Sequence, residues 1–129
     1  MEFSQDLANV TRVMEMYFEG LYHADTDKLA KVFHPDARYI NLIPDDYMNK
    51  PLTEYFEMID RRTPPASRAE PRDDRIVSIE FGGSKMAFVR ASITMMKREY
   101  LDFLTLSHDE LGWRVMTKIF TYIPVTKEV

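Results

Sequence analysis

The sequence predicts an α+β domain in which three N-terminal helices pack on an antiparallel sheet. Apolar residues recur at helical spacing in the first part of the chain, whereas strand-like runs joined by turn residues fill the chain from residue 73 onward. A proline-rich segment over residues 63–71 separates the two parts. Helices segregated from a run of antiparallel strands are typical of this class. The length of 129 residues fits one domain, expected to span residues 1–129.

The composition indicates a globular protein without thiol chemistry. Apolar residues make up 45% of the chain, and the charged fraction of 29% is ordinary. The absence of cysteine excludes a disulfide scaffold, a thiolate metal site and a cysteine nucleophile, and it fits a cytoplasmic location. A net charge of −4 gives no electrostatic reason to expect nucleic acid or an anionic membrane as a partner. The apolar runs are also too short to span a bilayer.

Two helices are expected first. The longer one should begin near Ser4, whose side chain can cap the free N–H groups of a helix start. Its buried stripe comprises Leu7, Val10, Met14, Tyr17, Phe18 and Leu21. The shorter one should be capped by Asp25 or Thr26 and end at His34, because the residue before Pro35 avoids helical backbone angles. Its stripe comprises Leu29, Val32 and Phe33.

A short hairpin and a third helix are expected next. Residues 38–43, which include Tyr39, alternate and suit a strand, and turn residues 44–46 lead to a brief return strand at residues 47–48. Pro51 suits the first turn of a helix. The third helix is expected to bury Leu52, Tyr55, Phe56 and Ile59.

Four antiparallel strands are expected to complete the sheet. They are placed at residues 75–81, 86–96, 100–107 and 112–120. Gly82 and Gly83 are predicted to close a two-residue hairpin between the first two strands. Residues 97–99 should form the next turn, and residues 108–112 the longer loop before the last strand.

These turns predict which side chains share a face of the sheet. With turns centred near Arg98 and near residues 109–110, Thr94 and Lys118 lie opposite Asp102 on the two neighbouring strands. The expected core face comprises Ala87, Val89, Ala91, Ile93, Leu101, Phe103, Val115 and Ile119. The other face, which mixes polar and large apolar groups, comprises Arg90, Ser92, Thr94, Tyr100, Asp102, Leu104, Met116, Lys118, Phe120 and Tyr122. The mixed face is expected to be a subunit interface or a pocket wall, and a one-residue slip would exchange the two faces.

Short motifs carry a resemblance to a known family. They lie at residues 17–22 (YFEGLY), 33–37 (FHPDA), 102–106 (DFLTL), 112–113 (GW) and 118–120 (KIF). Together with the order of elements, they resemble the nuclear-transport-factor-2-like superfamily, which has a SnoaL-like, cystatin-like cone, and within it the putative lumazine-binding family. The resemblance covers nearly the whole chain. It implies a curved sheet wrapped around three helices, a pocket between them and a homodimer formed through the sheet.

Asp102 and Lys118 are the first candidates for chemistry. Inside a pocket, the carboxylate can act as a general base and the lysine can hold an anionic ligand. On an exposed or interface surface, the same two residues would form a cross-strand salt bridge worth less than about 1 kcal/mol. The sequence leaves both interpretations open.

Tyr17 and His34 are further catalytic candidates. In ketosteroid-isomerase-like members of this fold an acid on the helical side polarises a carbonyl group, and the Tyr17 hydroxyl could do so; the alternative is a core tyrosine. His34, at the expected helix end, could contact an anion or act as an acid, or it could belong to a turn in which Asp36 bonds backbone amides. The ligand-binding candidates are Tyr17, His34, Tyr39, Tyr55, Arg90, Tyr100, Asp102 and Lys118.

Other clusters give weaker signals. The arginines around the proline-rich segment either clamp an anion or are neutralised by the acids among them. They are Arg61, Arg62, Arg68, Arg72 and Arg75. No two histidines have metal-ligand spacing, and no phosphate loop or dinucleotide fingerprint is present, so we expect no metal and no cofactor.

Three functions are compatible with these observations. We favour a small-molecule binding domain with an apolar pocket, for which the resemblance implies a lumazine- or pterin-like ligand, because no residue set is diagnostic of turnover. The first alternative is a ketosteroid-isomerase- or SnoaL-like enzyme that transfers a proton beside a carbonyl group, with Asp102 as the base. The second is a homodimeric interaction domain without catalysis.

Overall fold

The computed structural model describes residues 2–125. Its helices are α1 (Glu2–His23), α2 (Thr26–Leu29) and α3 (Leu52–Arg61), with short 3-10 helices η1 (Pro44–Asp46) and η2 (Pro65–Arg68). The expected third helix is confirmed as α3, but Pro51 precedes it as the N-cap residue instead of lying in its first turn. Asp25 caps α2, because its side chain accepts a hydrogen bond from the backbone N–H of Lys28.

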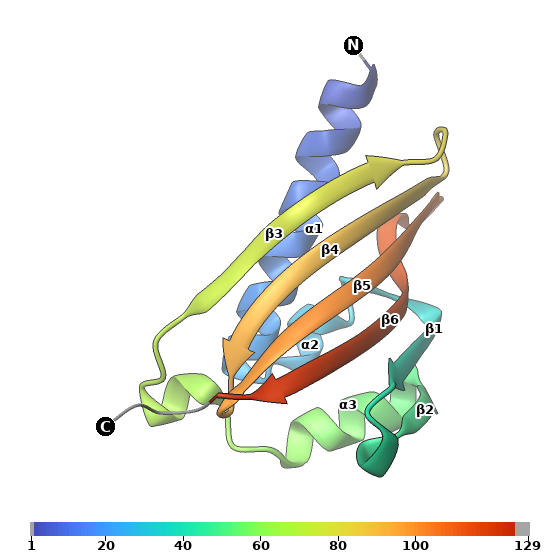
Figure 1. Cartoon of the computed structure of the whole chain (residues 1–129). Coiled ribbons are helices and arrows are strands. Elements are labelled where there is room, and N and C mark those ends of the chain that lie inside the picture. Colours follow the sequence, from blue (N-terminus) through green and yellow to red (C-terminus); the bar gives the residue numbers. More distant parts are fainter. Residues whose placement is uncertain (1, 126–129) are drawn as a thin grey trace.

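Six strands form one curved sheet in the order β2-β1-β6-β5-β4-β3. Their bounds are β1 (Phe33–Asn41), β2 (Met48–Pro51), β3 (Asp73–Phe81), β4 (Met86–Met95), β5 (Arg98–Asp109) and β6 (Gly112–Pro124). Neighbouring strands are antiparallel except β1 and β6, which pair in parallel. The α+β class is therefore confirmed, and the short hairpin of β1 and β2 joins the main sheet through the pairing of β1 with β6 (Figure 1).

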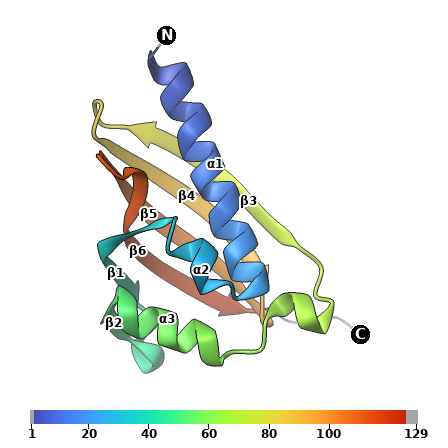
Figure 2. The ribbon, with the colours of Figure 1, turned by 180° about the vertical axis from the view of Figure 1, so that it is seen from behind.

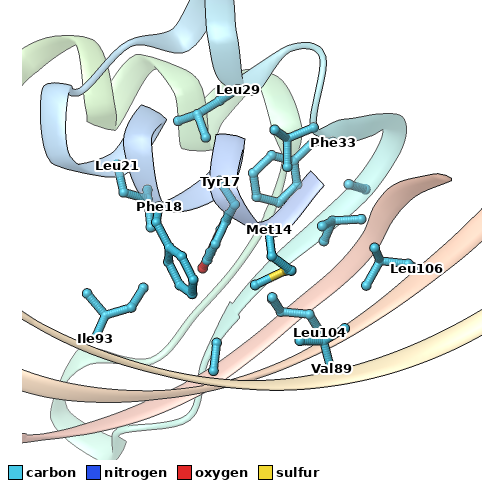
Figure 3. Close-up of a cluster of buried hydrophobic side chains, with 14 of the residues drawn as sticks. Met14, Tyr17, Phe18, Leu21, Leu29, Phe33, Val89, Ile93, Leu104 and Leu106 are labelled. Atoms are coloured by element: carbon cyan, nitrogen blue, oxygen red, sulfur yellow. The ribbon is translucent and has the colours of Figure 1, made fainter. Parts of the chain in front are cut away.

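The helices cover one face of this sheet. Seen from behind, α1 crosses the long strands, while α2 and α3 lie over the end that carries β1 and β2 (Figure 2). No helix covers the opposite, convex face in the described part of the chain. The core lies between the two layers, where α1 contributes Met14, Tyr17, Phe18 and Leu21 (Figure 3). Residues at this spacing share one side of a helix, as the sequence predicted. Leu7, which was expected in the same buried stripe, is instead exposed, because the first turns of α1 extend beyond the edge of the sheet (Figure 2).

The expected second helix is shorter than the sequence suggested. It ends at Leu29, and the chain turns over residues 30–32 before Phe33 opens β1. The backbone N–H of Val115 donates to the carbonyl of Val32, so pairing with β6 replaces the last helical turn. Pro35 is thus tolerated inside β1, where the ladder to β6 is interrupted between Phe33 and Arg38.

The predicted register between β4 and β5 is wrong by an odd number of residues. Thr94 faces Glu99, and Asp102 faces Ala91, because the turn is a two-residue loop at Met96 and Lys97. Both loop residues have positive φ (53° and 63°), the backbone of a type I′ hairpin. The odd shift places Leu101 and Phe103 on the convex face and brings Tyr100, Asp102 and Leu104 inside with the buried residues of β4.

A bulge in β6 also changes which of its side chains face the core. Leu106 pairs with Val115, but Thr105 pairs with Thr117, which leaves Met116 as an extra residue. Val115 before the bulge and Lys118 after it therefore both point into the core. Ile119, expected in the core, is only half-buried.

The loop between β3 and β4 also differs from the prediction. Phe81 pairs with Ala87, and the N–H of Gly82 donates to the carbonyl of Met86. The connection thus spans residues 82–85 instead of a two-residue Gly82–Gly83 turn. Within this connection Gly83 has a φ of +78°, a backbone conformation that glycine adopts without the steric cost that a Cβ atom would bring.

Candidate functional site

Four polar side chains from four elements meet inside the cone. Tyr17 comes from α1, Tyr55 from α3, Asp102 from β5 and Lys118 from β6. Their exposed fractions are 0%, 1%, 0% and 5%, so the whole group lies out of contact with water. Figure 3 shows Tyr17 reaching from α1 toward the sheet, beside Phe18. We call these four residues the polar cluster.

Tyr17 links the two charged members of the polar cluster. Its hydroxyl donates to Oδ2 of Asp102 and accepts a hydrogen bond from Nζ of Lys118 at 2.7 Å. Lys118 also donates to the hydroxyl of Tyr55 at 3.2 Å, and its Nζ lies 3.7 Å from Asp102 Oδ2. The buried ion pair is thus joined through a tyrosine hydroxyl. Asp102 and Lys118 are not direct cross-strand partners, because Asp102 pairs with Phe120 and Lys118 with Leu104.

One oxygen of the polar cluster has no partner. Oδ1 of Asp102 is buried, and no donor within the described residues 2–125 reaches it. Burying a carboxylate oxygen without a hydrogen bond is unfavourable by roughly 1–3 kcal/mol or more. An unmatched acceptor at this depth therefore indicates a position for an N–H or O–H donor.

Aromatic rings surround the ammonium group of Lys118. Its Nζ lies 5.0 Å from the ring centre of Tyr17, 5.2 Å from Phe120, 5.5 Å from Tyr55 and 5.9 Å from Tyr39. Ring faces stabilise a desolvated cation, an effect that grows as water is removed. The sequence predicted Lys118 beside Asp102, but it gave no sign of this aromatic enclosure. Phe120 is a contact that sequence reasoning missed as part of the site.

Burial keeps the tyrosines of the site protonated. Desolvation raises the pKa of Tyr17 well above its usual 10.0, and the charge of Asp102 raises it further. Desolvation likewise raises the pKa of Tyr55 and of Tyr39. A hydroxyl that stays protonated remains a donor, so Tyr17 continues to donate to Asp102 throughout the neutral range.

An aromatic row runs from the polar cluster to the start of β5 and the end of β6. Tyr39 stacks on Tyr55 with ring centres 4.0 Å apart, and Phe120 lies 5.1 Å from Tyr39 and 5.8 Å from Tyr100. Tyr122 follows at 5.4 Å from Tyr100. The row therefore consists of Tyr55, Tyr39, Phe120, Tyr100 and Tyr122. Three of the predicted ligand-binding residues, Tyr39, Tyr55 and Tyr100, belong to it.

Two predicted site residues lie elsewhere. His34 is not at a helix end but in β1, where its Nε2 lies 3.3 Å from Asp109 and its Nδ1 accepts the N–H of Asp36. Arg90 lies exposed on the convex face, with its guanidinium over the rings of Phe88 and Phe103. The shortened α2 explains the first difference, and the shifted register of β4 against β5 explains the second.

The arginines near the proline-rich segment do not form one clamp. Arg72 bonds to Glu19 at 2.6 Å and to Asp74 at 2.9 Å, while Arg68 lies 3.9 Å from Glu70. Neighbouring acids thus neutralise these two, as one of the two sequence interpretations held. Within residues 2–125 no group of three or more metal-ligating side chains comes together, and no helix there is long and apolar enough to cross a membrane.

Comparison with known proteins supports the fold and identifies a family. Residues 5–121 match a family described as "Putative lumazine-binding". An NTF2-like protein of unknown function from Shewanella baltica OS155 is similar in structure, with a TM-score of 0.83 and 23% identity over 95% of this chain and 97% of that one.

Two further solved structures share the architecture. An NTF2-like protein of unknown function from Silicibacter pomeroyi DSS-3 has a TM-score of 0.80 and 20% identity, and it covers 95% of this chain and 100% of its own. A cystatin-like fold protein from Burkholderia xenovorans LB400 has a TM-score of 0.69 and 16% identity over 92% of each chain. No curated protein matches the sequence. At these identities the structural similarity establishes the fold alone.

Proposed function

The chain belongs to the putative lumazine-binding family, and from this premise and the polar cluster we propose that it binds a small planar molecule of the lumazine or pterin class. The observation that carries the proposal is Oδ1 of Asp102, a fully buried acceptor to which no described residue donates. A ring N–H of the ligand would supply the missing hydrogen bond.

The groups around Oδ1 of Asp102 match a ligand ring in which an N–H group is adjacent to a carbonyl group. An ammonium group has three N–H donors, and two of those on Lys118 are directed at Tyr17 and Tyr55. The third is available for a ligand carbonyl while Asp102 accepts the adjacent N–H. The rings of Tyr39 and Phe120 are buried in the structure, and they would form apolar walls for the rest of a bicyclic ligand once the cone opens.

The ligand reaches Asp102 only if an element of the cone moves, because the polar cluster is buried. We assign this motion to α3. It has ten residues, only two of its side chains, Tyr55 and Ile59, are fully buried, and the proline-rich segment follows it. Short elements with few buried side chains open at low free energy. Amide hydrogens of α3 are therefore expected to exchange faster than those of α1, and to slow when ligand is added.

Calorimetric titration of the full chain with lumazine and with pterin tests the proposal. Asp102→Asn should weaken binding at least tenfold, since the Tyr17 hydroxyl would hold the amide oxygen at the Oδ2 position and leave an NH2 group facing the ligand N–H. Asp73→Asn, at the exposed start of β3, is the matched control. If neither compound binds to the folded wild-type chain, or if Asp102→Asn and Lys118→Ala both bind like wild type, the assignment is wrong.

A second function, proton transfer beside a carbonyl group, is favoured by one observation. Oδ1 of Asp102 is free to receive a proton, while Lys118 can donate to a developing oxyanion. The other carboxylate oxygen, Oδ2, already accepts a hydrogen bond from the Tyr17 hydroxyl. Isotope exchange into a test ketone decides between the functions. Exchange that Asp102→Asn abolishes while the ketone still binds would establish an enzyme.

We also propose that the chain forms a homodimer through its convex sheet face. Leu42, Leu101, Phe103 and Ile123 are 40–60% exposed there and surround shallow grooves. Arg90 and Glu99 lie exposed on the same face, four positions apart along the ladder between β4 and β5. A two-fold axis would place each arginine near the glutamate of the other copy, which is the complementarity that a self-pairing surface requires.

A further inference from the structure

The side chain of Tyr55 lies in a slot formed by β1 and β6. Its ring is stacked on Tyr39, with the ring centres 4.0 Å apart and an angle of 17° between the planes. The ring of Phe33 meets it nearly at right angles, with the ring centres 5.7 Å apart. At its tip, the hydroxyl accepts a hydrogen bond of 3.2 Å from Nζ of Lys118. Two aromatic rings and one cation therefore hold a flat ring that has an oxygen at its edge.

The hydroxyl of Tyr55 uses only part of its hydrogen-bonding capacity. The Tyr17 hydroxyl donates to Asp102 and accepts from Lys118. The Tyr55 hydroxyl accepts from Lys118, but its own O–H donates to no residue within 2–125. A buried hydroxyl that does not donate loses a hydrogen bond that water would otherwise provide, which is unfavourable. A carbonyl oxygen accepts without having a hydrogen to place, so it suits this position better than the tyrosine hydroxyl does.

The helix that carries Tyr55 is attached at the side of the fold. It packs chiefly on the short hairpin of β1 and β2 and on α2, whereas α1 crosses the long strands (Figure 2). Tyr55 and Ile59 are its only fully buried side chains. The ring of Tyr55 is thus one of two side chains that fix α3 to the core, and it leaves the interior when α3 opens.

We propose that the ring of Tyr55 occupies the place of the ligand in the free chain, and that the ligand binds by displacing it. The inference rests on the proposed function, in which α3 opens and a planar molecule enters. One ring of that molecule then stacks on Tyr39, and its carbonyl oxygen takes the hydrogen bond that Lys118 gives to Tyr55 in the free chain. The adjacent N–H of the ligand meets Oδ1 of Asp102, and α3 closes with Tyr55 turned outward. The slot selects a flat ring with an oxygen acceptor at its edge, because Tyr55 itself presents this group.

Chemical modification of the full wild-type chain tests the inference. Tetranitromethane nitrates accessible tyrosine rings, and peptide mass spectrometry reports the extent of nitration at each position. Without ligand, Tyr47, which is 59% exposed, should react, whereas the buried Tyr55 and Tyr17 should be protected. A saturating concentration of pterin should increase the nitration of Tyr55 severalfold and leave Tyr17 protected. This result would be the opposite of the protection that a ligand gives to a residue it covers.

Removal of the ring provides a second, independent test. Tyr55→Ala should bind pterin about tenfold more tightly than the wild-type chain, because no buried ring has to leave first. p-Cresol, which is the tyrosine side chain without its backbone, should bind to Tyr55→Ala but not to the wild type, and it should compete with pterin for the variant. If the two compounds bound Tyr55→Ala at the same time, or if the variant bound pterin no more tightly than the wild type, Tyr55 would not be standing in the place of the ligand.

The outcomes separate this inference from the function on which it rests. Pterin that binds the wild-type chain while Tyr55 stays protected from nitration would overturn the inference and leave the proposed function in place. Absence of pterin binding to both the wild type and Tyr55→Ala would overturn both. If loss of the buried ring prevents Tyr55→Ala from folding, nitration of the wild-type chain decides the result on its own.

Discussion

Nζ of Lys118 lies 3.7 Å from Oδ2 of Asp102, and the hydroxyl of Tyr17 is hydrogen-bonded to both atoms. Asp102 is fully buried and Lys118 is only 5% exposed, so each charge depends on the other and on the tyrosine between them. Buried pairs of this kind contribute little net stability, yet removing one partner is strongly destabilising.

Lys118→Met is therefore expected to lower the free energy of unfolding by about 3–5 kcal/mol. Adding Asp102→Asn to this variant should recover a large part of the loss, because the remaining buried charge disappears. Urea unfolding of the wild type, both single variants and the double variant gives the coupling energy, expected to exceed about 2 kcal/mol. The exposed pair of Lys50 and Glu54 serves as the control and should show a coupling below about 1 kcal/mol. If the losses in free energy of unfolding at Asp102 and Lys118 were strictly additive, the two side chains would not interact as a buried ion pair.

Alkaline pH should unfold the protein through its buried tyrosines. The pKa values of Tyr17, Tyr39 and Tyr55 are raised in the folded state, so above about pH 10 the unfolded chain releases protons that the folded chain retains. Their stabilising contribution is complete below this pH and is lost above it, by about 1.4 kcal/mol per pH unit for each tyrosine. Tyrosinate absorbance from these three residues should appear only as circular dichroism reports unfolding. Full ionisation of all seven tyrosines in the folded protein would refute the burial.

Lys97→Gly should stabilise the hairpin between β4 and β5. Lys97 has a φ of 63°, which disfavours a residue with a Cβ atom and suits glycine, so a gain of about 0.5–1 kcal/mol is expected in thermal or urea unfolding. Gly112→Ala is the opposite change at a φ of +85° with no neighbour within 4 Å of the added Cβ, and it should lose a similar amount. A stabilising Gly112→Ala would mean that these turns have another conformation.

Phe103→Glu should prevent the proposed homodimer, because it places a charge in the centre of the convex face where the wild-type ring is 40% exposed. Sedimentation equilibrium should give the mass of one chain for this variant and of two chains for the wild type. Leu7→Glu is the control, since Leu7 is 47% exposed on α1, away from the convex face. A wild-type protein that sediments as a monomer at micromolar concentration would remove the dimer proposal.

The sequence predicted the elements of this fold well and their register less well. The helical stripe of α1 is a local pattern, and it correctly placed Tyr17 in the core. Asp102 and Lys118 were expected on the face opposite the core face, but the structure buries both. The turn at Met96 and Lys97 carries no glycine or asparagine to mark its positive φ angles, so its position could not be read from residue type. That single turn decides whether Leu101 or Tyr100 faces the core.

His34 illustrates a different limit. The residues before Pro35 fit a helix end by local preference, but the tertiary pairing of residues 32 and 33 with β6 draws them into an extended strand. Tyr55 and Phe120 were each expected in an element without any sign that they would enclose Lys118. Contacts between distant elements depend on packing, which has no periodic signature in one chain.

The extra residue at Met116 lets one strand present both Val115 and Lys118 to the interior. In a strictly alternating strand, residues three positions apart lie on opposite faces. If β6 kept all its residues but lost the bulge, Lys118 would project from the convex face and Ile119 would take its place beside Tyr17. Removal of Met116 itself would instead close the ladder from Val115 to Thr117 and leave Lys118 inside. A backbone irregularity, and not residue type alone, thus admits a cation to an otherwise apolar interior.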